Sequence, residues 1–62
     1  MVLNKIKEAR VKKRLTQYAL AKKLNKSHWW ISRVERGLTK VNEDEKIKIA
    51  KALGVDVREV FP

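Results

Sequence analysis

One ten-residue stretch, residues 27–36, carries most of the side chains in this chain that are suited to recognising another molecule. It holds one histidine and two each of serine, tryptophan and arginine: Ser27, His28, Trp29, Trp30, Ser32, Arg33 and Arg36. Hydroxyl, imidazole and guanidinium groups donate hydrogen bonds to phosphates and to base edges, and indole rings pack on apolar groups. The mixture favours binding of a polyanion over a chemical reaction.

Patterns typical of catalysis or metal binding are missing from the sequence. The chain has no cysteine and a single histidine, so it offers neither a thiolate nucleophile nor a histidine or cysteine ligand set. There is no glycine-rich phosphate loop, and most acidic residues fall where the first turns of helices are expected. We therefore predict a protein that is not an enzyme and that uses no cofactor and no metal.

The positive charge is concentrated in the first two thirds of the chain. Residues 1–40 carry 12 basic and two acidic side chains, a net charge of +10, whereas residues 41–62 carry four basic and five acidic ones, a net charge of −1. A strongly basic part suggests a face for nucleic acid. A lysine-rich surface that only keeps a small protein in solution is the alternative, and charge alone does not decide between them.

The length and the apolar content limit the size and the location of the protein. Sixty-two residues suffice for one domain, so we expect a single domain over 1–62. The longest apolar run, residues 18–21, is far too short for a membrane span or a signal-peptide core. We predict a cytoplasmic protein with neither a membrane nor a small-molecule substrate as its partner.

Apolar spacing and capping residues predict five helices and no strand, an all-α fold. The expected helices cover about 3–13, 17–24, 28–36 and 43–53, with a short one from 57. Residues that cap helix starts precede four of them, and residues that end helices follow three: Thr16, Ser27, Asn42 and Asp56, and Asn25, Gly37 and Gly54. Glu45 and Glu59 complete capping-box patterns with Asn42 and Asp56.

The second and third expected helices are separated by only four residues, 24–27. So short a turn does not allow antiparallel packing; it holds the helices at a steep angle and lets the second one protrude. If Ile31 and Val34 face the core, the outer arc of that helix carries His28, Trp29, Ser32, Arg33 and Arg36. A protruding helix of this kind fits the major groove of B-DNA.

Several segments, in their order and spacing, resemble the phage repressor and Cro-like (XRE-type) helix-turn-helix family. They are Leu15-Thr16-Gln17 followed by Leu20-Ala21 and Leu24, then 31–37, 49–55 and Val60-Phe61. The resemblance runs along the whole chain and implies a compact five-helix bundle, the lambda-repressor-like DNA-binding fold. It also implies a sequence-specific transcriptional regulator that binds double-stranded DNA. We predict a repressor, with an activator as the alternative, and we further infer a homodimer on a two-fold symmetric operator.

The resemblance assigns base reading in the major groove to His28, Trp29 and Arg33, with Ser32 beside them. A guanidinium donates two parallel bonds to guanine O6 and N7, so Arg33 is the main expected base reader, with a simple phosphate contact as the alternative. Trp29 is expected to pack on thymine methyl groups and sugars or to bind a protein. Trp30 is expected either at the DNA or folded over the edge of the core.

The resemblance also implies contacts to the DNA backbone and a buried ion pair. Ser27, Arg36 and Lys40 match positions near phosphates, and Gln17 matches a glutamine that binds a phosphate and braces the recognition helix. Tyr18 is expected to touch a phosphate or to be a packed or solvated ring. The buried pair, with a structural role, would join Arg10 to Glu35.

Some positions depart from the family pattern. Arg14 and Asn25 stand where glycine is usual, and Lys26 replaces an apolar residue of the turn. We expect Val57, Val60 and Phe61 to form the dimer interface or only to close the core.

A protein-interaction module, such as an antitoxin-like partner subunit, is the alternative function. A basic peptide that coats membranes or RNA is a third possibility, which the well-placed caps disfavour.

Overall fold

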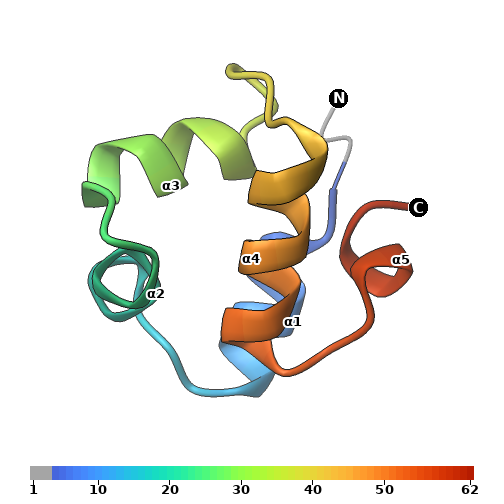
Figure 1. Cartoon of the computed structure of the whole chain (residues 1–62). Coiled ribbons are helices and arrows are strands. Elements are labelled where there is room, and N and C mark those ends of the chain that lie inside the picture. Colours follow the sequence, from blue (N-terminus) through green and yellow to red (C-terminus); the bar gives the residue numbers. More distant parts are fainter. Residues whose placement is uncertain (1–3) are drawn as a thin grey trace.

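The computed structural model describes residues 4–62, which form five helices and no strand (Figure 1). The helices are α1 (Ile6–Lys12), α2 (Gln17–Leu24), α3 (His28–Glu35), α4 (Glu43–Leu53) and α5 (Val57–Val60). The predicted all-α class and the helix order are confirmed. Helix α1 begins later than predicted and α3 ends one residue earlier; the expectation for Leu3 lies outside the described residues.

Three predicted capping residues begin their helices as expected. Thr16, Ser27 and Asn42 each accept a hydrogen bond from the backbone N–H three residues further on. Helix α4 carries the full capping box, since the Glu45 carboxylate accepts a bond from the Asn42 N–H at 3.0 Å. These bonds satisfy amide groups that a helix start otherwise leaves without a partner.

Asp56 caps α5 as predicted, but it does not form the predicted capping box with Glu59. Asp56 accepts a hydrogen bond from the N–H of Arg58, two residues on, at 2.8 Å, instead of pairing reciprocally with Glu59. The helix is only four residues long. Its first turn is therefore closed by the short-range bond that aspartate makes in tight turns, and the second predicted capping box is wrong.

The core takes side chains from every helix, and α4 runs through the middle of the view in Figure 1. The chain before α1 is joined to the far end of the fold, because the Lys5 N–H donates to the Val60 carbonyl at 2.8 Å. The largest fully buried side chains are Ile6, Leu20, Ile31, Val34, Ile49, Leu53 and Val60.

Within residues 4–62, none of the helices has the length and apolarity needed to cross a lipid bilayer.

Candidate nucleic-acid interface

Helices α2 and α3 run in clearly different directions: Figure 1 shows α2 nearly end-on, with α3 crossing above it. The turn between them is set by Asn25, whose φ of 56° and ψ of 42° are left-handed. The next residue, Lys26, donates its backbone N–H to the Ala21 carbonyl at 2.9 Å, which closes the end of α2. The steep crossing predicted from the four-residue turn is present.

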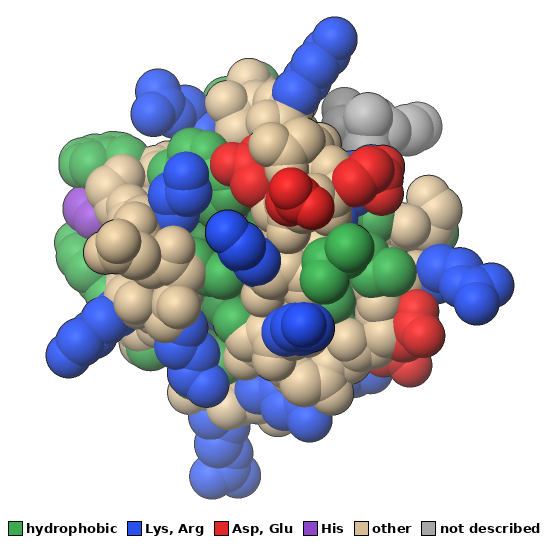
Figure 2. Space-filling view, in the orientation of Figure 1, with side chains coloured by type: hydrophobic (Ala, Val, Ile, Leu, Met, Phe, Trp, Pro, Cys, Tyr) green, Lys and Arg blue, Asp and Glu red, His purple; other side chains and the backbone are tan. Residues whose placement is uncertain are grey.

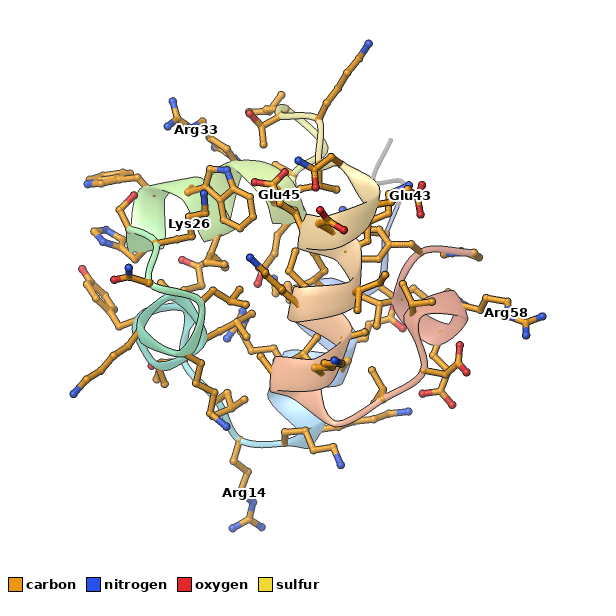
Figure 3. All side chains as sticks on the ribbon, in the orientation of Figure 1. Arg14, Lys26, Arg33, Glu43, Glu45 and Arg58 are labelled. Atoms are coloured by element: carbon orange, nitrogen blue, oxygen red, sulfur yellow. The ribbon has the colours of Figure 1, made fainter. Side chains whose placement is uncertain are left out.

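Helix α3 has one face in the core and another in solvent. Ile31 and Val34 are buried, and Glu35 beside them is also buried. The opposite side carries Trp29, Arg33 and Arg36, all exposed, together with the half-buried His28 and Ser32. Figure 3 shows Arg33 pointing away from the body of the molecule. The five outer side chains are thus grouped on one surface, which we call the α3 outer face.

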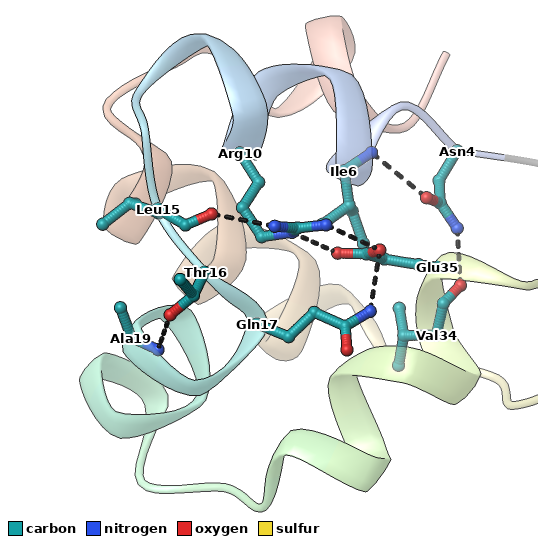
Figure 4. Close-up of polar contacts among 9 residues, drawn as sticks. All are labelled: Asn4, Ile6, Arg10, Leu15, Thr16, Gln17, Ala19, Val34 and Glu35. Atoms are coloured by element: carbon teal, nitrogen blue, oxygen red, sulfur yellow. Dashed lines mark hydrogen bonds and ion pairs between the residues drawn. The ribbon is translucent and has the colours of Figure 1, made fainter.

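The buried face of α3 is fixed by the predicted ion pair (Figure 4). Arg10 Nε donates to Glu35 Oε2 at 2.7 Å, and Arg10 Nη1 donates to the Leu15 carbonyl at 2.8 Å. Gln17 Nε2 donates to Glu35 Oε1 at 3.2 Å. Glu35 therefore joins α3 to α1 and to the first residue of α2. The pair predicted from the resemblance is confirmed, and Gln17 does brace the helix.

Asn4 is a further anchor that the sequence analysis missed. Its Nδ2 donates to the Val34 carbonyl at 2.8 Å, and its Oδ1 accepts a bond from the Ile6 N–H at 3.1 Å (Figure 4). One side chain thus satisfies the start of α1 and a carbonyl near the end of α3. An asparagine two residues before a buried isoleucine is a helix-start signal, which the earlier predicted start of the helix had hidden.

Trp30 lies apart from the α3 outer face. Its ring is half-buried and packs against the core. The Lys26 ammonium is 5.0 Å from the ring centroid and 3.6 Å from a carboxylate oxygen of Glu45, and Figure 3 shows Lys26 and Glu45 close together. The sequence analysis placed Trp30 either at the DNA or over the edge of the core, and the structure has the ring at the core edge. Lys26 fills the place of the family's apolar turn residue through a cation–π contact and an ion pair.

Three aromatic rings form a stack where α2 and α3 meet. The Tyr18 and His28 ring centroids are 4.1 Å apart with an interplanar angle of 25°, and those of His28 and Trp29 are 4.6 Å apart. Figure 2 shows hydrophobic side chains and the histidine gathered at the left edge, over this part of the molecule. We call Tyr18, His28 and Trp29 the aromatic stack. Sequence spacing had not linked Tyr18 to His28.

Three of the residues expected near phosphates are exposed in or after α3. Ser27 is exposed and caps α3, Arg36 is the exposed residue that ends it, and Lys40 is exposed in the loop before α4. The single acidic residue of α2 and α3 is Glu35, which is buried against Arg10. The solvent-facing charges of the two helices are therefore all positive, as a phosphate-binding surface requires.

Comparisons with known proteins point to one family. The sequence profile described as helix-turn-helix matches residues 6–60. Similar solved structures include a Bacteroides fragilis protein to which DNA binding is ascribed, with 35% identity over 97% of both chains and a TM-score of 0.87. Another is the restriction-modification controller protein C.AhdI from Aeromonas hydrophila, with 33% identity over 89% of this chain and 80% of that one and a TM-score of 0.83. No curated protein sequence matches the chain.

Proposed function

We propose that this chain, which belongs to the helix-turn-helix family, is a sequence-specific transcriptional regulator of one domain. In this proposal α3 enters the major groove of double-stranded DNA. The carrying observation is the division of α3 into a buried face and the α3 outer face, which is rich in donors and free of acidic groups. The DNA binding ascribed to the Bacteroides fragilis protein and the controller role named for C.AhdI agree with this proposal.

Base recognition is proposed for the α3 outer face. Arg33 lies one turn after Trp29, and its exposed guanidinium is free to donate two bonds to guanine O6 and N7. His28 and Ser32 bring a ring nitrogen and a hydroxyl group to neighbouring base edges. A good bidentate contact discriminates against the wrong base by about 1–3 kcal/mol.

Phosphate contacts are proposed for Gln17, Ser27, Arg36 and Lys40. The Gln17 amide has two donor hydrogens, and the bond to Glu35 uses one of them, so the other remains for a phosphate oxygen. Gln17 would then link the DNA backbone to the brace that orients α3. Trp30 is left out of the proposed interface because its ring packs against the core.

A homodimer and repression are the finer parts of the proposal. The backbone spans 23 × 21 × 21 Å, less than the roughly 34–36 Å between half-sites one helical turn apart, so reading both needs two copies. Val60 is fully buried and cannot belong to the predicted interface. Ile47, 43% exposed on α4, with the half-buried Val57 and Phe61, offers an apolar surface for a second copy.

Repression follows from the size and position of such a dimer on DNA. A bound pair of copies on a promoter blocks access of RNA polymerase. The cytoplasmic location predicted from the sequence is part of this proposal, since the protein would act where the DNA is held.

The test begins with selection of binding sites from a random duplex library. We expect an enriched two-fold symmetric site, and Arg33→Ala should reduce its preference over scrambled DNA by about 5- to 150-fold, the equivalent of 1–3 kcal/mol. Arg58→Ala is the matched control, because Arg58 is an equally charged, exposed side chain that points away on α5 (Figure 3).

Titration at two salt concentrations separates base reading from phosphate contacts. Lys40→Ala should weaken binding to all sequences alike and reduce the salt dependence by about one ion. If no site is enriched, or if Arg33→Ala and Arg58→Ala behave alike, then α3 does not read DNA sequence.

A further inference from the structure

The aromatic stack exposes a large apolar surface at one end of the α3 outer face. Trp29 is 68% exposed and Tyr18 is 66% exposed, although tryptophan is normally among the more buried residues. The stack takes one ring from α2 and two from α3, so it bridges the two helices of the motif. None of the three rings is needed to close the core described above, which suggests that they contact a partner.

The charge around the stack identifies the class of that partner. Lys22 lies one turn after Tyr18, and Arg33 lies one turn after Trp29, both exposed. The only acidic residue of the two helices is buried in its ion pair. An apolar surface with a purely basic surround suits duplex DNA, on which the proposed function already places α3.

The chemistry of the major groove limits what an indole can recognise there. Bases in a duplex hide their faces against their neighbours and present only their edges. The indole N–H is a donor only, and its ring surface is apolar. Among the groups on the major-groove edges, the apolar one is the methyl group at C5 of thymine. The same group is present on 5-methylcytosine.

We propose that Trp29 recognises the C5-methyl group of a pyrimidine, in thymine or in 5-methylcytosine, close to the base pair that Arg33 reads. This inference rests on the proposed function. Four helical residues rise by about 6 Å, which is one to two base-pair steps of roughly 3.4 Å. The methylated pyrimidine therefore lies within two base pairs of the guanine bound by Arg33.

Tyr18 and His28 are positioning residues in this proposal. The His28 ring lies 4.6 Å from that of Trp29 and supports the indole directly, and Tyr18 of α2 lies 4.1 Å behind His28 and holds it in place. An indole held in one orientation loses little conformational freedom when the methyl group binds. Without this support the same ring would cover the methyl group for only part of the time.

A uracil scan tests the proposal directly. Each thymine of the selected site is replaced in turn by deoxyuridine, which removes the methyl group and keeps every hydrogen-bonding atom. Wild-type protein should lose about four-fold in affinity at one position per half-site, the effect of burying one methyl-sized group. Trp29→Ala should bind the thymine and uracil duplexes equally well. Val11→Ala, a change at an exposed apolar residue of α1, should keep the four-fold difference.

A second pair of duplexes separates the two sources of the methyl group. The sensitive thymine–adenine pair is replaced by cytosine–guanine and by 5-methylcytosine–guanine. Tighter binding of the methylated duplex supports recognition of the methyl group on either base. Equal binding of these two duplexes, together with a uracil effect, supports recognition of thymine alone.

Tyr18→Ala tests the positioning role. It should reduce the difference in affinity between the thymine and uracil duplexes through a faster dissociation rate, while the preference for the guanine read by Arg33 is kept.

Three outcomes overturn the proposal. The first is a uracil scan without any effect while Arg33→Ala still reduces site preference; the proposed function then stands without methyl recognition. The second is a thymine–uracil difference in affinity that persists in Trp29→Ala; the methyl effect then comes from DNA shape or from another residue. Absence of any preferred site overturns the proposed function as well. Thermal unfolding of each variant confirms that it is folded, as expected for substitutions of exposed side chains.

Discussion

At the scale of single residues, Arg14 is the clearest case of a backbone requirement that the side chain does not suit. Its φ is 56°, in the left-handed region, as is that of Asn25. Asparagine tolerates this conformation, whereas for other side chains it costs roughly 1–2 kcal/mol. The family pattern has glycine at this place, and the backbone now supplies the reason. Arg14 is exposed and points away from α3 (Figure 3).

Arg14→Gly is therefore expected to stabilise the fold by about 1 kcal/mol, because relief of the left-handed strain exceeds the extra entropy of glycine in the unfolded chain. For a domain of this size that raises the Tm by about 4–8 °C. Arg14→Ala is the control: it removes the same charge and retains the Cβ, so it should bring no gain. Equal stabilisation by both variants, measured by thermal unfolding, would assign the effect to charge repulsion.

At the scale of helices, the relative placement of α1, α2 and α3 depends on one carboxylate. Glu35 accepts hydrogen bonds from Arg10 and from Gln17. Arg10 also donates a hydrogen bond to the Leu15 carbonyl, in the segment between α1 and α2. Removing one partner of such a buried pair leaves an uncompensated charge in the interior. The orientation of α3 therefore rests on polar contacts as well as on apolar packing.

Glu35→Ala should lower the free energy of unfolding by about 3–5 kcal/mol, since it leaves the Arg10 guanidinium without its carboxylate. Glu59→Ala, at an exposed acid of α5, should change it by less than about 0.5 kcal/mol. Urea denaturation followed by circular dichroism gives both values. A loss below 1 kcal/mol for Glu35→Ala would mean that apolar packing alone orients α3.

Much of the helical arrangement could be predicted from the sequence because its signals are local. Caps such as Ser27 and Asn42 and the stop at Asn25 act within a few residues of their own positions, and all three are found as predicted. The outer arc of α3 followed from helical spacing once Ile31 and Val34 were assigned to the core.

Contacts between distant residues could not be predicted in the same way. The ring of Tyr18 meets that of His28 only because the turn folds α2 against α3. Likewise, the Lys26 ammonium pairs with the Glu45 carboxylate 19 positions away and lies over the Trp30 ring. The ion pair between Arg10 and Glu35 was expected from family resemblance alone, since nothing in their spacing indicates it.

At the scale of the whole molecule, the uneven charge agrees with the proposed division into a part for DNA and a part for a second copy. The basic excess lies in residues 1–40, whereas residues 41–62 carry a net charge of −1. Two copies meeting through the near-neutral part avoid strong repulsion between their basic surfaces. On the proposed two-fold site, the small extents of one copy would limit it to a single half-site.

Ile47→Lys is expected to prevent dimer formation, because it places a charge in the proposed apolar interface on α4. Cooperative binding to the two-fold site should then disappear, while affinity for an isolated half-site is kept. Val11→Lys introduces the same charge at a residue of α1 that is 59% exposed, and it should leave the dimer intact. Sedimentation equilibrium measures the association; a dimer unchanged in both variants would place the interface elsewhere.

The split of α3 into two faces has a consequence for how this protein can change. The side chains that hold the fold, Ile31, Val34 and Glu35, lie on one face, and Trp29 and Arg33 lie on the other. Substitutions on the outer face leave the core contacts and the ion pair in place. If the outer face reads DNA as proposed, target preference is able to drift, or to be redesigned, without loss of folding. Gene duplicates of this chain would then acquire separate DNA targets through a few changes on a single helix.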